Sequence, residues 1–422
     1  MRQRLMFGKR VLLGAVTALL FSSTYSSVAA RPGERSIWVS SWAAAEIATD
    51  PKEALPSGQD MTLRQLVRLS AGGKTIRLRI SNAFGNAPLE ISAVDVARAI
   101  SPASPQIDPQ TDRAVTFNGA PAASIPPGAE YVSDPIAIAM PAFATLAVSL
   151  HFAGLPQRQT GHPGSRATSY FAPGNQLSGA SLRDASKVDR WYYLDGVDVE
   201  SELASAAVAV VGDSIVDGHG VVSNTNGRWT DYLAERLKGR LAVLNLGIGS
   251  NCLSQNCVGA AVPARFGRDV LSRNGISYVI ILEGVNDLGV LTRDAPVSPE
   301  AHRALVQRMI GALAQVTRRA RERGIKVIGG TIMPYGASGY YHPDAANDAD
   351  RDAVNAWIRA PGHVDAVVDF DALMRDPRHP NRLKKEFDSG DGLHPSPEGY
   401  RFMGEAVPLS LFAESRPVRS HR

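Results

Sequence analysis

Between residue 38 and about residue 150, apolar and polar positions alternate in short segments. The segment Ile76-Arg-Leu-Arg-Ile-Ser81 alternates strictly, which is typical of a β-strand with one buried face. Residues 65–70 are joined to it by Ala71-Gly-Gly73, so the two segments are predicted to pair as a β-hairpin. Glycine and proline punctuate the whole region, which favours an antiparallel β-sandwich or a jelly-roll-like domain. Further strands are expected at residues 89–96, 130–138, 146–152 and 188–199.

After residue 205 the pattern changes to apolar runs that alternate with helix-like segments. The runs are continuous, which indicates strands buried on both faces of a mainly parallel sheet. This order predicts a flavodoxin-like, three-layer α/β/α domain. The expected strands are residues 206–211, 241–246, 278–282, 327–331 and 366–369. The expected helices are residues 228–238, 263–272, 299–323, 347–359 and 397–411.

The chain of 422 residues is longer than one hydrophobic core usually supports, so two folded domains are expected. We predict a β-rich domain at residues 31–203 and the α/β domain at residues 204–415. A basic C-terminal tail follows at residues 416–422.

Residues 1–30 have the layout of a secretory signal peptide. Four basic residues precede an apolar stretch at residues 11–21, and small residues follow up to Ala30. The apolar stretch is too short to span a bilayer, which favours a cleaved signal over a retained anchor. We therefore expect a secreted or periplasmic protein with no transmembrane segment in the mature chain.

Removal of this segment changes the charge of the chain. The full sequence has 45 basic and 41 acidic residues, and four of the basic ones lie in residues 1–30, which leaves 41 of each sign. A chain without net charge gives little support to binding of nucleic acid or of an anionic membrane. A neutral polymer or a small neutral ester fits better.

Two cysteines occur, Cys252 and Cys257, and both lie in one predicted loop. In an oxidising compartment they can form a local disulfide, which their spacing permits without requiring it. Cysteine and histidine residues do not have the spacing of metal ligands, so no metal is expected. No organic cofactor is expected either.

Residues with catalytic chemistry follow the predicted parallel strands. Ser214 follows the first strand, Asn286 lies after the third, and Asp391 and His394 precede the last helix. Because loops after parallel strands open on one edge of a sheet, these side chains are expected to meet there. A serine, a histidine and an aspartate that meet are what nucleophilic acyl transfer requires.

Four short blocks in this order make the sequence resemble the GDSL/SGNH hydrolase superfamily. The blocks are Gly212-Asp-Ser214, a segment within residues 245–251, Gly284-Val-Asn-Asp287 and Asp391-Gly-Leu-His394. The β-rich part, which begins Trp38-Val-Ser-Ser-Trp42, looks like that of a bacterial secreted branch of arylesterase-like and acetylxylan-esterase-like proteins. The resemblance covers essentially the whole mature chain.

The resemblance implies a role for each of these residues. Ser214 would attack the ester carbonyl, His394 would accept its proton, and Asp391 would orient the imidazole and stabilise the imidazolium. The oxyanion would be bound by the backbone N–H of Ser214, by a backbone N–H of the second block and by the side chain of Asn286.

The second block departs from the family pattern. Where Gly-Gly is common before Asn251, this chain has Gly249-Ser250. Strict alignment places Ser250 at the donor position, and its backbone N–H can serve if the local φ is tolerable. Gly249 would donate after a one-residue adjustment, so both residues stay candidates.

Four further residues are candidates for substrate contact. Asp217 and His219 follow the nucleophile and would line the mouth of the site, and Tyr335 and Tyr340 belong to an aromatic-rich loop after the fourth strand. Aromatic side chains beside a cleft suit recognition of sugars or aryl groups, but packing of the loop explains them equally well.

The expected function is a secreted serine esterase that acts through an acyl-enzyme on Ser214. Short acyl groups, such as O-acetyl on polysaccharides, or aryl esters are the expected substrates. The alternatives are a lipase or acylhydrolase acting on longer-chain lipid esters, and a catalytically weak glycan-binding protein. A binding role does not need intact Ser214, Asn286, Asp391 and His394 together, which argues against the last alternative.

Overall fold

The computed structural model describes residues 37–412, which belong to one compact unit. The predicted signal peptide at residues 1–30 and the predicted tail at residues 416–422 lie outside the described residues. Among the described residues, no helix is long and apolar enough to cross a membrane.

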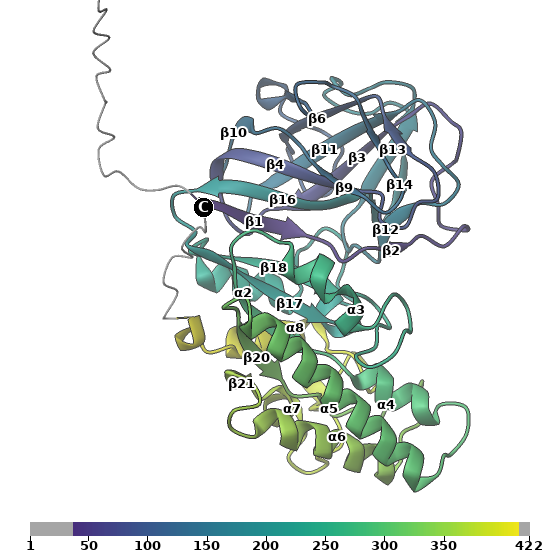
Figure 1. Ribbon diagram of the computed structural model, residues 1–422, viewed down its shortest axis with the longest axis vertical. Coiled ribbons are helices and arrows are strands. Elements are labelled where there is room, and N and C mark those ends of the chain that lie inside the picture. The colour runs from purple at the N-terminus through teal and green to yellow at the C-terminus, as the bar shows by residue number, and fades with distance from the viewer. Residues whose placement is uncertain (1–36, 413–422) are drawn as a thin grey trace, which may run out of the picture. The chain divides into compact units, whose positions relative to one another are not determined.

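Strands β1 to β16 form an antiparallel β-rich region, as predicted (Figure 1). One sheet has the order β1-β16-β4-β10, with β9 also paired to β4, and a second has the order β14-β13-β3-β11-β6-β7. Buried side chains of both sheets, such as Leu78 and Val148, belong to one apolar cluster, which is the arrangement of a sandwich. Two smaller sheets have the orders β15-β12-β2 and β5-β8. The strands are β1 (Ile37–Ala43), β2 (Ile47–Ala48), β3 (Met61–Arg68), β4 (Gly73–Ser81), β5 (Leu89–Ile91), β6 (Ala93–Arg98), β7 (Arg113–Val115), β8 (Ala123–Ile125), β9 (Glu130–Val132), β10 (Ile136–Met140), β11 (Thr145–Phe152), β12 (Thr160–Pro163), β13 (Ser169–Pro173), β14 (Ser186–Val188), β15 (Arg190–Tyr192) and β16 (Leu194–Ser201).

The predicted β-hairpin is wrong, because β3 and β4 are consecutive strands of different sheets. β3 pairs with β11 and β13, whereas β4 pairs with β16, β10 and β9. The alternation identifies both strands, but a period of two fixes which side chains are buried and not which strand is the partner. Gly72 lets the chain cross between the sheets, since a Cβ there would lie 2.6 Å from the Ala142 backbone nitrogen and 2.6 Å from the Met140 carbonyl oxygen.

The C-terminal half contains a five-stranded parallel sheet with the order β18-β17-β19-β20-β21. Every residue of β17 is buried, as expected for a central strand covered on both faces. The crossover from β18 back past β17 to β19 reverses the strand order, and ligands bind at such a reversal in open α/β sheets. The strands are β17 (Ala206–Gly212), β18 (Leu241–Gly247), β19 (Ile276–Leu282), β20 (Lys326–Gly330) and β21 (Ala366–Val368).

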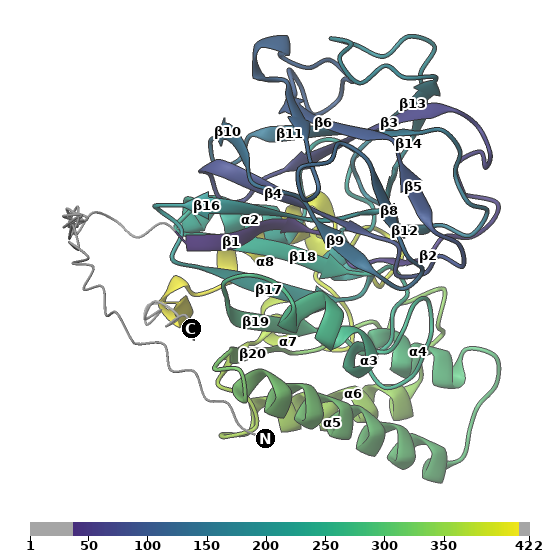
Figure 2. The same ribbon diagram turned by 45° about the horizontal axis from the view of Figure 1, so that its top comes forward.

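Helices complete a three-layer α/β/α arrangement, which confirms the predicted fold class (Figure 2). α2 packs against α8 and β18, whereas α5 packs against α3, α4 and α6. The helix predicted at 397–411 ends earlier, because Pro408 cannot continue it. The helices are α1 (Ser214–Asp217), α2 (Trp229–Leu237), α3 (Val262–Phe266), α4 (Val285–Thr292), α5 (Pro299–Arg321), α6 (Ala345–Arg359), α7 (Phe370–Met374) and α8 (Pro397–Ala406). Short 3₁₀ segments lie at Pro109–Thr111, Lys385–Phe387 and Leu409–Phe412, and a π-helical segment lies at Gly267–Leu271.

The β-rich region packs directly on the parallel sheet. Strand β1 contacts β17 and β18, and the buried guanidinium of Arg273 donates to both oxygens of Asp195 at 2.7 and 2.6 Å. The last antiparallel strand ends at Ser201 and the first parallel strand begins at Ala206. A domain boundary between residues 203 and 204 stays a prediction.

Candidate active site

Ser214 begins helix α1 directly after strand β17, at the carboxyl edge of the parallel sheet. The Asp213 side chain caps this helix by accepting a hydrogen bond from the Ile215 backbone N–H at 2.8 Å. Gly212 allows the tight turn, because a Cβ there would lie 2.3 Å from the Leu282 carbonyl oxygen and 2.3 Å from a Val216 methyl carbon. The sequence therefore fixes a buried strand, an abrupt turn and a serine at its end.

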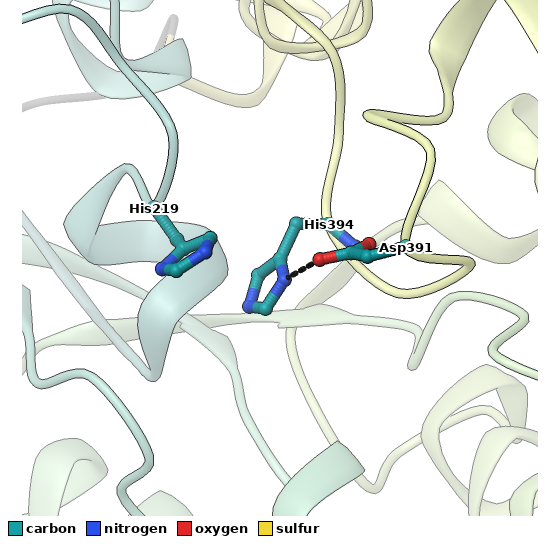
Figure 3. Close-up of side chains that lie close together, drawn as sticks. All are labelled: His219, Asp391 and His394. Carbon is teal, nitrogen blue, oxygen red and sulfur yellow. Dashed lines mark hydrogen bonds and ion pairs between the residues drawn. The ribbon is translucent and has the colours of Figure 1, made fainter. Parts of the chain in front are cut away.

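Ser214, His394 and Asp391 form a continuous hydrogen-bonded chain. The Ser214 Oγ lies 2.8 Å from the His394 Nε2, and the His394 Nδ1 lies 2.6 Å from the Asp391 Oδ2. Figure 3 shows the second of these bonds, with Asp391 and His394 on the same loop. The structure thus brings Ser214 to a histidine that lies 180 positions away in the sequence.

The charge of Asp391 sets the tautomer of His394. Partial burial alone would raise the pKa of Asp391, but hydrogen bonds from the backbone N–H and the ring of His394 outweigh it and lower the pKa to about 2. An ionised carboxylate only accepts, so Nδ1 of His394 carries a proton that it donates to Asp391. Nε2 then presents its lone pair to the Ser214 hydroxyl, which is the arrangement of a general base.

Asn286 lies in the first turn of α4 with its amide orientation fixed by two partners. Its Nδ2 donates to the Asn251 carbonyl oxygen at 2.6 Å, and its Oδ1 accepts from the Tyr341 hydroxyl at 2.6 Å. Each amide nitrogen has two protons, so a second N–H of Asn286 is available as a donor. Tyr341 is absent from the predicted site residues. The aromatic-rich loop was its only signal, because spacing along the chain does not show which side chain a hydroxyl reaches.

The turn after β18 contains both predicted backbone donors, Gly249 and Ser250. Ser250 has a φ of 58°, a left-handed conformation that glycine adopts without strain and that costs a residue with a side chain about 1–2 kcal/mol. Its carbonyl oxygen accepts from the Val258 N–H at 3.2 Å, which ties the turn to the following loop. The left-handed φ explains why glycine is common at this position, and the choice between Gly249 and Ser250 as donor stays open.

The loop after this turn is closed by a disulfide between Cys252 and Cys257. Asp287 orders the same loop by accepting from the backbone N–H groups of Leu253 and Ser254, each at 2.7 Å. Burial raises the pKa of Asp287, and these hydrogen bonds oppose the shift. Asp287 therefore acts on the shape of the loop and does not face Ser214 in this hydrogen-bond pattern.

Two other buried carboxyl groups lie beneath the site. Burial raises the pKa of Asp213 to about 7, and burial also raises the pKa of Glu283 well above its ordinary value, with Asp213 as the next cause. Arg265 is the nearby cation, with its Nη2 3.9 Å from a Glu283 oxygen. The floor of the site therefore holds less negative charge at neutral pH than its composition suggests.

The four predicted substrate contacts divide into two groups. Asp217 and Tyr335 are buried, so the prediction that Asp217 lines the mouth is wrong, and Tyr335 presents no surface for the predicted recognition of a sugar or aryl group. Asp217 bonds to His162 of strand β12, and the Tyr335 ring packs edge-on against Tyr341. His219 and Tyr340 are exposed and stay candidates, and Tyr340 packs edge-on against Tyr341 with ring centroids 4.7 Å apart.

The ring of His219 stacks on the ring of His394, with centroids 4.0 Å apart and an interplanar angle of 29°. Figure 3 shows the two rings side by side, with His219 on a separate segment from His394 and Asp391. Ligand atoms of the three residues lie within 4.8 Å of one another. Both nitrogens of His394 already bond to Asp391 and Ser214, so the group fits a base with its neighbours better than a metal site.

Comparisons with known proteins identify the C-terminal half of the chain. Residues 210–402 match the model of the GDSL-like Lipase/Acylhydrolase family. No curated protein matches the chain closely enough to count as a relative.

Two solved structures illustrate the likeness. A GDSL-like lipase from Bacteroides thetaiotaomicron is 19% identical in sequence. The alignment covers 50% of this chain and 89% of the lipase chain, with a TM-score of 0.37. A catalytic mutant of an acetylxylan esterase from Geobacillus stearothermophilus is 21% identical and covers 52% of this chain and 98% of its own, with a TM-score of 0.37.

The matched residues include Ser214, Asn286, Asp391 and His394. The C-terminal half of the chain is therefore a GDSL-like lipase/acylhydrolase (SGNH) domain, and the protein is a hydrolase of the serine-esterase class.

Proposed function

We propose that the protein is a secreted serine esterase that hydrolyses short-chain carboxylic esters through an acyl-enzyme on Ser214. The observation that carries the proposal is the unbroken chain of hydrogen bonds from the Ser214 hydroxyl through His394 to Asp391. Export is proposed from the signal-like residues 1–30. The disulfide Cys252–Cys257 suits the oxidising surroundings that export implies.

In the acylation step the Ser214 Oγ attacks the ester carbonyl carbon while its proton passes to the His394 Nε2. The carbonyl π bond breaks, and the electron pair moves to the oxygen as an oxyanion. His394 then returns the proton to the alcohol oxygen as the bond from carbon to that oxygen breaks. Asp391 stays ionised throughout and stabilises the imidazolium, consistent with its lowered pKa.

The oxyanion is stabilised by donors that are already in place. The backbone N–H of Ser214 is the first N–H of helix α1, and the first N–H groups of a helix have no partner within it. The second N–H of Asn286 and a backbone N–H of the Gly249–Ser250 turn complete the proposed set. Each such donor contributes about 3–4 kcal/mol to lowering the barrier.

In deacylation a water takes the place of the alcohol. His394 accepts a proton from this water as its oxygen attacks the acyl carbon, and the proton then passes to the Ser214 Oγ as the acid leaves. The same three residues therefore serve both half-reactions.

A groove of about 550 Å³ supports a bulky, hydroxyl-rich alcohol moiety such as an acetylated polysaccharide. Residues of strands β2, β12 and β15 line it, together with Val258 and Gly259, which directly follow the disulfide loop. Polar side chains at its rim, Asp50, Glu53 and Arg190, offer hydrogen bonds to hydroxyl groups. Val258 bonds to the Ser250 carbonyl oxygen, so the groove begins next to the proposed oxyanion turn.

The nucleophile is tested with Ser214→Ala in the purified protein and a short-chain aryl ester as substrate. We expect turnover to fall at least about a thousandfold with the folded structure unchanged. Undiminished turnover in this variant would contradict the proposal.

Substrate class is tested with a series of aryl esters of increasing acyl length, together with acetate release from acetylated xylan. The proposal predicts a preference for short chains and release of acetate. A preference for long chains without acetate release would favour the lipid-ester alternative. Binding of glycan without hydrolysis of any ester would favour the glycan-binding alternative.

A further inference from the structure

A second histidine–aspartate pair lies inside the molecule, next to the proposed site. His162 belongs to strand β12 of the β-rich region, and its Nε2 lies 3.0 Å from the Oδ1 of Asp217 at the end of α1. The other ring nitrogen, Nδ1, lies 2.7 Å from the Ala45 carbonyl oxygen. The side chains of His162 and Asp217 are only 3% and 6% exposed.

The partners of His162 determine the charge of this pair. A carbonyl oxygen only accepts, so Nδ1 must carry a proton and donate it to Ala45. A second proton must then lie between Nε2 and the Asp217 oxygen, because two lone pairs would otherwise face each other. Whichever atom holds that proton, histidine and aspartate together have no net charge.

The neutral pair lies where a negative charge would destabilise the oxyanion formed during ester hydrolysis. Asp217 is three residues after Ser214 on the same helical turn, and residues at this spacing share a face. Its second oxygen, Oδ2, lies 3.7 Å from the position that a Cβ on Gly249 would occupy, which is in the turn proposed to bind the oxyanion. Without His162, this carboxylate would add negative charge beside the turn and oppose the negative charge that develops on the substrate.

The loop that follows β12 also holds the end of α1 in place. Arg166 Nε donates to the Gly218 carbonyl oxygen at 3.0 Å. Arg228 Nε donates to the Asp217 carbonyl oxygen at 3.1 Å, and the same guanidinium also donates to the carbonyl of Ser165. The last turn of the nucleophile helix is thus fixed by contacts with the β-rich region.

We propose that His162 is a positioning residue for ester hydrolysis: it neutralises Asp217 and fixes it beside the Gly249–Ser250 turn. The β-rich region then completes the active site instead of serving as a separable binding module. This inference rests on the proposed esterase function.

The test compares His162→Gln, Asp217→Asn and the double variant in the full-length protein, all in the same buffer. Reactive sites are first counted with a fluorophosphonate, and turnover of an aryl acetate is then expressed per reactive site. We expect H162Q to lower kcat about tenfold with KM within about twofold, because the added charge acts on the transition state.

Replacement of Asp217 by asparagine removes the negative charge and should restore turnover in the H162Q protein. In D217N the amide can donate to a neutral His162, so kcat should fall no more than about threefold. We expect the double variant H162Q/D217N to turn over within about threefold of D217N. A merely structural role for His162 would instead leave the double variant as impaired as H162Q.

His151→Gln is the matched control. The His151 Nε2 lies 2.6 Å from the Asp60 Oδ1 in the same β-rich region, but Asp60 is exposed and the pair makes no contact with the site residues above. Its kcat should equal that of the unaltered protein.

Two results would overturn the inference. The first is an H162Q protein whose kcat per reactive site is unchanged. The second is a double variant that turns over at less than a tenth of the D217N rate, and this comparison decides the matter even if H162Q alone does not fold. Failure of the fluorophosphonate to label Ser214 in the unaltered protein would instead contradict the esterase proposal itself.

Discussion

Two histidine–aspartate pairs, one at the edge of the parallel sheet and one buried between strand β12 and helix α1, have the same residue types but different chemistry. His394 and Asp391 lie at the edge, where the aspartate side chain is 43% exposed, whereas Asp217 of the inner pair is 6% exposed. The decisive difference is the third partner. His394 faces the Ser214 hydroxyl, whose proton it can accept, while His162 faces the Ala45 carbonyl, which has no proton to give.

The comparison shows that the partner of the second ring nitrogen decides what a histidine can do. A hydroxyl partner leaves a lone pair on the ring for a base to use. A carbonyl partner together with a carboxylate engages both nitrogens, so the ring has no free lone pair for a base and acts only through charge balance and position. The predictions below test this division, beginning with the largest effect.

The edge pair should be far more sensitive to substitution than the inner one. His394→Gln removes the base and should lower kcat about 10³–10⁴-fold, against about tenfold for H162Q. Steady-state kinetics on an aryl acetate measure both values. His379→Gln, at an exposed position, is the control and should have unchanged kinetics. Similar losses in H394Q and H162Q would remove the distinction between the pairs.

The next largest loss of kcat is expected when a proposed oxyanion donor is removed. Asn286→Ala removes a proposed oxyanion donor and should lower kcat about 10²–10³-fold. Tyr341→Phe removes only the hydroxyl that holds the Asn286 Oδ1, so we expect a smaller loss, at most about tenfold, in kcat more than in KM. A larger loss in Y341F than in N286A would show that Tyr341 acts on substrate directly.

Substitution of the buried carboxyl group of Asp213 should change the stability of the fold more than the turnover of ester. Burial raises the pKa of Asp213 to about 7, so the folded protein holds this proton more tightly than the unfolded chain, where the pKa is about 3.9. The resulting stability is complete below about pH 4 and is lost as the pH rises through about 7.

Asp213→Asn keeps the helix cap but cannot titrate. Its melting temperature should therefore fall less than that of the unaltered protein between pH 5 and about 8. Calorimetry of both proteins across this range measures the difference. Parallel pH profiles would mean that Asp213 is ionised in the folded state.

The smallest expected effect is at Ser250, beside the oxyanion turn. Ser250→Gly relieves the left-handed backbone and should stabilise the fold by about 1 kcal/mol. If only the backbone N–H of this turn acts on the oxyanion, kcat stays unchanged. A clear change in kcat at equal stability would implicate the serine side chain in shaping the acyl pocket.

The parallel sheet and the meeting of Ser214, Asp391 and His394 could be predicted from the sequence. Continuous apolar strands fix a sheet covered on both faces, and the ends of such strands lie on one edge, so residue order is enough to bring these side chains together. The bond between His394 and Asp391 is predictable for a further reason, since it joins residues only three apart on one tight loop.

Other features could not be predicted, because they depend on contacts between residues that lie far apart in the sequence. The partner sheets of β3 and β4 are set by strands far along the chain, so an alternating pattern could not exclude the hairpin. His162 lies on strand β12 and Asp217 on helix α1, 55 residues apart, and Tyr341 reaches Asn286 over the same separation. Burial of Asp217 follows only from how the two sheet systems pack.

The central claim, that Ser214 is a nucleophile activated by His394, is tested most directly by mass spectrometry of the protein after reaction with a fluorophosphonate. The account predicts one covalent adduct per chain, located on the Ser214 peptide, with esterase activity lost in proportion and labelling much slower in H394Q. Full esterase activity in protein that is completely modified on Ser214, or an adduct on a different residue, would contradict it.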